Sequence, residues 1–270
     1  MKQNCTFAVL VLSLNALSGC VNDQEENETA LGRAPNALEN DNALDVNALN
    51  VNALNVNALN VNALSANALA AIQDSGPNGT LARQLLEYTV SCALNDMQTF
   101  SFSWIDAIEV LHNEHYQGHL ALEPSWSTGP LSASGARWVS ACLASRVNYY
   151  GEHVIISSRG SISVLSGPGA TEQSGYQMLE GAFWGNLYTD PPELYACHYA
   201  TNDAHSRSKL RDCAAGHIVN SVPQDCGIIH IVGTCDTACQ TINAEGTFYP
   251  SCRPDSGAAW TDQVITVFLP

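Results

Sequence analysis

Two segments beyond residue 79 carry hydrophobic side chains at helical spacing. In the first, Thr80 is suited to cap a helix, and apolar side chains behind it recur at steps of four, three and four up to Cys92. This pattern predicts a helix over 80–93. A second helix is predicted over 132–149, with Ser132 as its cap and a glycine just beyond its end. Each helix has one apolar side that must pack against another element.

Short strand-like segments make up most of the remaining domain, and glycine, proline, asparagine and aspartate separate them. They are expected at 100–104, 118–122, 154–157, 161–165, 183–188, 194–199, 227–232 and 264–269. Two helices followed by a run of strands predict an α+β fold. We expect the two N-terminal helices to pack on an antiparallel β-sheet.

An Asn-Ala-Leu repeat precedes this domain, starting at Asn36 and recurring every five residues from Asn42 to Asn67. On a helix, a five-residue step places successive leucines about 140° apart, and on a strand an odd step sends them to opposite faces. Neither structure buries the leucines together. A square β-helix of the pentapeptide-repeat type is the ordered alternative, although the residue order within each unit is inverted. The repeat therefore predicts a disordered tether over 20–79, followed by a globular domain over 80–270.

The first twenty residues have the features of an export signal. Lys2 supplies a positive charge, 7–17 is an apolar stretch too short to span a bilayer, and Leu-Ser-Gly-Cys ends at Cys20. This segment resembles the bacterial lipoprotein signal. The resemblance implies removal of 1–19, lipidation of Cys20 and anchoring to a membrane of the cell envelope. Val21 stands where an aspartate would retain the protein in the inner membrane, which favours the outer membrane.

Ten cysteines occur in the chain, and eight remain once Cys5 and Cys20 are set aside. An even number in an exported protein predicts four disulfides. The eight are Cys92, Cys142, Cys197, Cys213, Cys226, Cys235, Cys239 and Cys252. Cys92 and Cys142 lie on the buried sides of the two predicted helices, so we pair them. A neighbour-first order for the rest gives Cys197–Cys213, Cys226–Cys235 and Cys239–Cys252. A zinc site at Cys235 and Cys239, with His230 nearby, is the alternative.

The charge balance excludes one class of partner. The chain has 26 acidic and 10 basic side chains, a net charge of -16, and no basic stretch able to neutralise phosphates. Nucleic-acid binding is therefore not expected. The sequence also lacks G-x-G-x-x-G, the P-loop and the G-x-S-x-G serine elbow, so we predict no nucleotide, no cofactor and no α/β-hydrolase chemistry.

Three histidines are close together in the sequence, at His112, His115 and His119. Two imidazoles on one face can bind a divalent metal. The segment 109–118 is expected to form a hairpin turning at Asn113 and Glu114, which makes His112 and His115 cross-strand neighbours. These two residues are the candidate metal ligands, and surface hairpin histidines without a metal are the alternative.

The segment 180–188 combines glycines with polar and aromatic side chains. Trp184, Asn186 and Tyr188 are candidates for a ligand-binding platform. Glu180 is a candidate general acid or base, with His198 as its partner. Packing of the aromatic rings against a helix is the structural alternative.

Segments 86–94, 137–148 and 180–187 resemble parts of exported proteins from myxobacteria, and that resemblance implies no activity. Two functions stay open. The first is a membrane-anchored surface or periplasmic lipoprotein that binds an extracellular polymer or a protein partner. The second is an exported hydrolase that acts on polysaccharide or cell-wall material through Glu180. The missing catalytic motifs favour the binding module.

Overall fold

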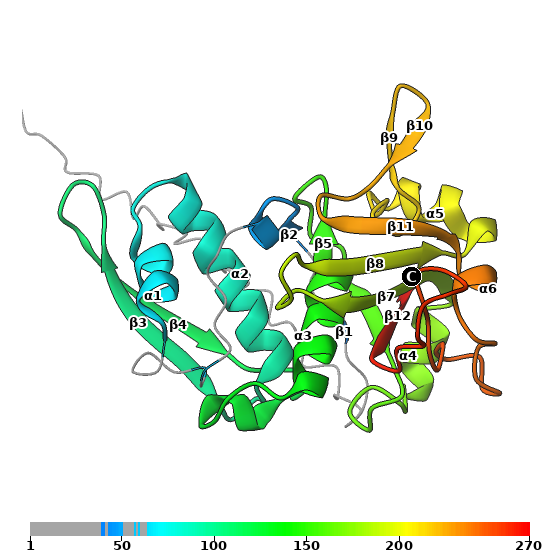
Figure 1. Ribbon diagram of the computed structural model, residues 1–270, viewed down its shortest axis with the longest axis horizontal. Coiled ribbons are helices and arrows are strands. Elements are labelled where there is room, and N and C mark those ends of the chain that lie inside the picture. The colour runs from blue at the N-terminus through cyan, green and yellow to red at the C-terminus, as the bar shows by residue number, and fades with distance from the viewer. Residues whose placement is uncertain (1–38, 41–42, 51–56, 58, 60–63) are drawn as a thin grey trace, which may run out of the picture. The chain divides into compact units, whose positions relative to one another are not determined.

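The computed structural model describes residues 39–40, 43–50, 57, 59 and 64–270. The fold mixes helices and strands, as predicted, and the described residues belong to one compact unit (Figure 1). The helices are α1 Ala66–Gln73, α2 Pro77–Ala93, α3 Ala133–Arg146, α4 Ala170–Gly175, α5 Asp203–Ser208 and α6 Cys235–Ala238, with 3-10 turns at η1 Ala48–Asn50, η2 Pro124–Ser127 and η3 Ala200–Asn202. The predicted signal segment and Cys20 lie outside the described residues.

Six strands form the main sheet, in the order β1-β6-β12-β7-β8-β11. Their bounds are β1 Glu39–Asn40, β6 Ile156–Arg159, β7 Met178–Asn186, β8 Glu193–His198, β11 Ile229–Thr234 and β12 Val264–Leu269. All neighbours are antiparallel except β8 and β11, which are parallel. The wholly antiparallel sheet that we predicted is therefore wrong at this edge. The long crossover between β8 and β11 permits the parallel pairing, and short-range pattern does not reveal it.

Both faces of this sheet are covered. On one face α3 contacts β7, β8 and β12, and Phe183 and Ile265 join the core there. On the other face Trp184 and Phe268 pack with Tyr249 and the cysteines of two disulfides. Double burial explains why β12 is apolar at nearly every position.

Helix α2 lies beside α3 and carries a hairpin on its other side (Figure 1). The remaining strands are β2 Leu44–Asp45, β3 Thr99–Ile105, β4 Leu111–Gln117, β5 Val147–Asn148, β9 His217–Val219 and β10 Val222–Gln224. Pro77 occupies the first turn of α2, so this helix starts before the predicted Thr80. Helix α3 starts as predicted, because the Ser132 hydroxyl accepts a hydrogen bond from the Gly135 amide at 2.9 Å.

The Asn-Ala-Leu repeat contributes to the core where the structure describes it. Leu44, Leu49 and Leu59 are at most 4% exposed, and Leu64 and Leu69 pack against the same cluster. The boundary at Thr80 is therefore too late, and 43–79 is no free tether over its described part. Leu44 lies in a short strand, Leu49 in a 3-10 turn and Leu69 in a helix. A regular period could not predict this burial because each leucine has a different local conformation.

Two segments expected to be strands serve other purposes. Residues 118–122 cap α2, because the Leu120 and Leu122 amides donate to the carbonyls of Ser91 and Cys92 at 2.8 and 3.1 Å. Those carbonyls lie in the last turn of the helix, where no intrahelical donor reaches them. Residues 161–165 form a turn that the Gly160 amide closes onto the Leu165 carbonyl at 3.2 Å.

The four disulfides join all eight cysteines beyond Cys20. The predicted pairs Cys92–Cys142 and Cys239–Cys252 are confirmed. The other two predictions are wrong, because the structure pairs Cys197 with Cys235 and Cys213 with Cys226. The first of these joins the ends of β8 and β11, which are neighbours only because of the unpredicted parallel pairing.

Candidate functional site

A cavity of about 310 Å³ lies where β8 and β11 end. The carboxyl ends of parallel strands meet at one edge of a sheet, which is a common place for ligand sites in α/β sheets. The lining residues come from β8, α5, the β10 region and β11. They are His198, Asp203, Arg207, Ala215, Pro223, Gln224, Asp225, Ile231 and Gly233.

His198 ends β8, and the following helix α5 supplies the residue that orients it. The His198 Nδ1 atom lies 2.8 Å from Oδ1 of Asp203, and the two side chains are 18% and 23% exposed. A carboxylate can only accept, so Nδ1 carries the proton of this hydrogen bond. Nε2 has no hydrogen-bond partner among the described residues and is the ring nitrogen left for a ligand or a proton.

Arg207 adds a positive charge one helical turn after Asp203. Its Nη1 atom lies 3.9 Å from Oδ2 of Asp203, and Nη2 donates to the Ala215 carbonyl at 3.3 Å. Nε is buried without a hydrogen-bond partner among the described residues. The Ala215 carbonyl and the Asp203 carboxylate thus orient the guanidinium, and Arg207 lines the cavity.

Three aspartate–histidine pairs with a five-residue spacing occur in this part of the chain. Besides His198 and Asp203, His217 Nδ1 lies 2.7 Å from Asp212, and His230 Nδ1 lies 2.9 Å from Asp225. Asp225 lines the cavity, and Asp212 is almost fully buried. Of these six residues, only His198 and His230 were singled out from the sequence, and neither was expected to pair with an aspartate. The repeated spacing was visible in the sequence, but it marks a pair only when the residues between form a turn.

Two disulfides hold the walls of the cavity. Cys197 directly precedes His198, and its partner Cys235 follows β11. Cys213 lies two residues before Ala215, and its partner Cys226 directly follows Asp225. Each wall is thus covalently linked close to a lining residue, which makes the cavity preorganised.

Gly181 allows the chain to approach the sheet closely beside this site. A Cβ atom at Gly181 would lie 2.1 Å from the Cys197 carbonyl oxygen and 3.2 Å from Cβ of Ala214. A side chain at position 181 does not fit there. Because Gly181 has none, the segment next to Ala215 can pack over β7 and β8.

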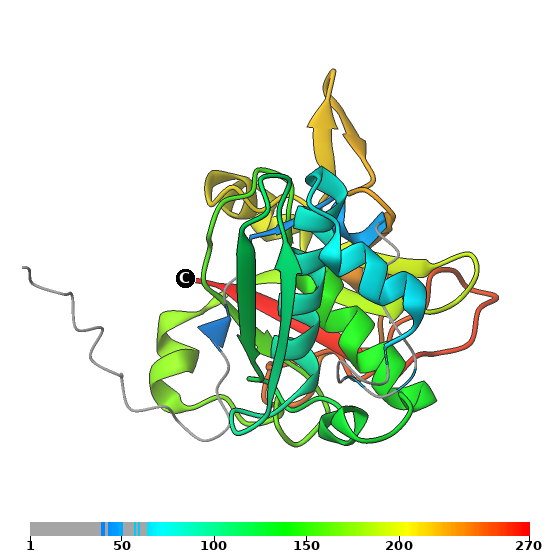
Figure 2. The same ribbon diagram turned by 90° about the vertical axis from the view of Figure 1, so that its left-hand side faces the viewer.

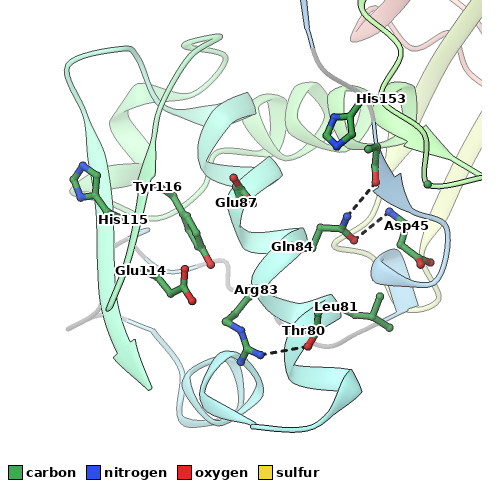
Figure 3. A pocket seen from close by; sticks show the side chains of 12 residues that line it. Asp45, Thr80, Leu81, Arg83, Gln84, Glu87, Glu114, His115, Tyr116 and His153 are labelled. Atoms are coloured by element: carbon green, nitrogen blue, oxygen red, sulfur yellow. Dashed lines mark hydrogen bonds between the residues drawn. The ribbon is translucent and has the colours of Figure 1, made fainter. Parts of the chain in front are cut away.

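A larger depression of about 660 Å³ crosses α2, but its polar groups serve the fold (Figure 3). Gln84 donates to the Ala43 carbonyl at 3.0 Å and accepts from the Asp45 amide at 3.2 Å. Arg83 donates to the carbonyls of Ile72 and Asp74 at 3.0 and 2.7 Å. These contacts hold the N-terminal segments on α2. The smaller cavity therefore offers the better candidate site.

The neighbours of Arg83 confirm this structural role. Its guanidinium lies 3.6 Å from the centre of the Trp104 ring, and Trp104 Nε1 donates to Glu114 at 2.8 Å. Burial and the nearby Glu114 and Glu87 raise the pKa of Tyr116 above its ordinary value. The side chains of the depression thus bind one another and join α2 to the β3–β4 hairpin.

Glu180 does not lie in either cavity and is not available for acid–base chemistry. Its carboxylate is 0% exposed and lies 2.7 Å from Nη2 of Arg211. Arg211 Nε also contacts Glu180 at 3.1 Å. The predicted pairing of Glu180 with His198 is wrong, because the ion pair removes the carboxylate from solvent.

The predicted aromatic platform is also absent among the described residues. Trp184 is 1% exposed within the core behind the sheet. Tyr188 packs edge-on against Trp126, and burial raises the pKa of its hydroxyl. Asn186 accepts a hydrogen bond from the Tyr188 amide at 3.0 Å. These side chains stabilise the fold. The alternative expected packing against a helix, whereas Trp184 packs with Tyr249 and disulfide cysteines.

The candidate metal ligands lie on one strand. The β3–β4 hairpin turns at 106–110, where Asp106 accepts hydrogen bonds from two turn amides, so His112 and His115 both belong to β4. Three residues apart on a strand, they point to opposite faces. His112 Nε2 binds Asp106 at 2.9 Å, and His115 Nδ1 lies 2.8 Å from the Ser101 hydroxyl. The predicted cross-strand metal pair is wrong.

The zinc alternative fails for a similar reason. Cys235 and Cys239 belong to different disulfides. Within the described part of the chain, only Cys197, Cys239 and Cys252 bring three metal-ligating atoms within 4.8 Å of one another, and all three sulfurs are in disulfides.

No family model matches the chain, and no curated protein or solved structure is significantly similar to it. Within the described residues, no helix has the length and apolar character needed to cross a membrane.

Proposed function

We propose that this chain is an envelope lipoprotein, anchored through Cys20, whose folded unit binds a hydroxyl-rich unit of an extracellular polymer in the cavity at His198. The main support for this proposal is that two disulfides hold the residues that line the cavity. A preorganised pocket loses little entropy when a ligand binds.

Cysteine usage supports export. The pairing of all eight cysteines beyond Cys20 is compatible with an oxidising compartment outside the cytoplasm. The lipobox-like segment ending at Cys20 supports the anchor, because a protein held by two or more acyl chains stays bound to a membrane.

The chemistry of the cavity supports a neutral, hydroxylated ligand. Asp203 and Asp225 accept hydrogen bonds, Arg207 donates them, and Gln224 does both. A polyanion would meet the two carboxylates and the net charge of -16. A volume of about 310 Å³ suits one sugar unit, and it is at the lower end for small-molecule sites.

Metabolic labelling with radioactive palmitate tests the anchor. We expect label on the wild-type chain and none on Cys20→Ser. Label that persists in Cys20→Ser would refute the anchor. Loss of label in Cys5→Ser would place the lipid on Cys5 and would also refute it.

Calorimetric titration of the detergent-purified full chain tests the ligand. The probes are the hexaoses of xylose, glucose and N-acetylglucosamine, with oligogalacturonate as the anionic comparison. We expect a neutral hexaose to bind, and Gln224→Ala to weaken binding about tenfold through the loss of one hydrogen bond. Gln240→Ala, an exposed glutamine outside the cavity, is the matched control. Equal affinity in Gln224→Ala, or preference for the anion, would refute the proposed site.

A further inference from the structure

His198, Asp203 and Arg207 form a more specific arrangement than binding requires. We propose that this cavity hydrolyses O-acyl esters on its hydroxyl-rich ligand, with His198 as the general base. The proposal rests on the proposed function, because the same cavity must first hold the glycan.

The imidazole has the geometry of a general base. His198 Nδ1 donates its proton to Asp203 Oδ1, and the two atoms are 2.8 Å apart. Nε2 is therefore the unprotonated nitrogen of the neutral ring. Nε2 has no partner among the described residues, and His198 lines the cavity. A base in this position can take a proton from a water molecule in the cavity.

Water is the nucleophile that this cavity allows. Its lining residues include no serine, threonine, cysteine or lysine. A covalent acyl-enzyme formed on such a side chain is therefore not available here. Direct hydrolysis needs only a base for the water and a donor for the oxyanion.

Arg207 is placed to stabilise the oxyanion. It belongs to the same short segment as Asp203, and its Nη1 atom makes only a 3.9 Å contact there, beyond hydrogen-bond distance. The bond from Nη2 to the Ala215 carbonyl holds the guanidinium in place. A fixed cation that faces a developing negative charge contributes more in a partly buried site than in water.

The reaction balances without a cofactor. His198 Nε2 takes a proton from water while the oxygen attacks the ester carbonyl, and the carbonyl oxygen becomes an anion beside Arg207. The tetrahedral intermediate collapses, the C–O bond to the sugar breaks, and the sugar oxygen takes the proton from Nε2. The products are the free hydroxyl and the carboxylic acid, which ionises in solution.

The charges of the cavity favour an ester over a phosphodiester. Asp203 and Asp225 both line the site and would repel an anionic substrate, whereas an acyl ester of a sugar is neutral.

Acetate release from O-acetylated xylo-oligosaccharides by the full chain is the test. We expect wild-type turnover, a loss of about 100-fold or more in kcat/KM for His198→Ala, and partial rescue by added imidazole. His112→Ala is the matched control, because His112 is also paired with an aspartate but lies in the β3–β4 hairpin. Circular dichroism and xylohexaose titration show whether each variant is folded and binds.

The outcomes separate the two proposals. Xylohexaose binding without acetate release, or full turnover in His198→Ala, overturns the esterase and leaves the binding function standing. Absence of both binding and turnover overturns both proposals. Loss of turnover in His198→Ala with retained binding and imidazole rescue supports the esterase.

Discussion

Arg211 and Glu180 form a fully buried ion pair in which Nη2 lies 2.7 Å from Oε2. Arg211 also donates to the carbonyls of Val147 and Ser145 at 2.9 and 3.0 Å, at the end of α3. One guanidinium therefore joins strand β7 to the last turn of the central helix. The carboxylate that the sequence suggested for chemistry is a fold contact.

Removal of the charge on Glu180 should destabilise the protein. Glu180→Gln leaves the Arg211 charge buried without its carboxylate, so we expect the free energy of unfolding to fall by about 3 to 5 kcal/mol. Urea denaturation measures the change. Glu193→Gln alters an exposed carboxylate on β8 and should cost less than about 0.5 kcal/mol. Glycan binding lost at unchanged stability would instead place Glu180 in the site.

Two disulfides should differ in their effect on the cavity. Loss of Cys213–Cys226, which closes 13 residues, should cost about 3 kcal/mol and weaken hexaose binding, because this bridge holds the cavity wall. Loss of Cys92–Cys142, which closes 50 residues, should cost about 4 kcal/mol and leave binding unchanged. Paired cysteine-to-alanine variants, compared by denaturation and calorimetry, test this. Equal effects of both on binding would contradict a local role for Cys213–Cys226.

The repeat leucines should behave as core residues. Leu44 is 0% exposed, so Leu44→Ala should lower the free energy of unfolding by about 2 to 5 kcal/mol. Leu111 is 59% exposed, and Leu111→Ala is the matched control with little expected effect. Thermal unfolding of both variants is sufficient. Equal melting temperatures for Leu44→Ala and wild type would restore the tether interpretation.

Alkaline pH should destabilise the fold through Tyr249. Burial raises the pKa of this tyrosine to about 12, with Asp236 and Tyr199 adding to the shift. An unfolded tyrosine ionises near pH 10, so its contribution is complete below about pH 10 and is lost as the pH rises towards 12. The loss amounts to about 2 to 3 kcal/mol. Denaturation between pH 9 and 12 should show a shallower decline for Tyr249→Phe than for wild type.

The sequence predicted correctly those features that depend on residues within a single helix or strand. Ser132 caps α3, and β12 follows its apolar run, because caps and continuous hydrophobicity act within one element. The Cys92–Cys142 pair was accessible because both residues lie on the inner sides of predicted helices.

Features that depend on distant neighbours could not be predicted in the same way. Cys197 finds Cys235 only because β8 and β11 lie parallel, and His198 finds a base-orienting partner only because α5 turns back towards it. The hairpin at Asp106 was misplaced because the signal lies in one carboxylate that caps the turn. The roles of Cys197 and His198 therefore depend on how distant segments are brought together, which local sequence pattern does not provide.

The parallel edge of the sheet has an evolutionary consequence. The chain leaves β8 after His198 and re-enters the sheet at Ile229, and everything between is a single excursion that includes the projecting hairpin β9–β10 (Figure 2). Insertions, deletions or replacements within this hairpin leave the buried Arg211–Glu180 pair and the strand order of the main sheet untouched. The main sheet can therefore stay constant while ligand specificity changes through this one hairpin, whose Pro223 and Gln224 line the cavity.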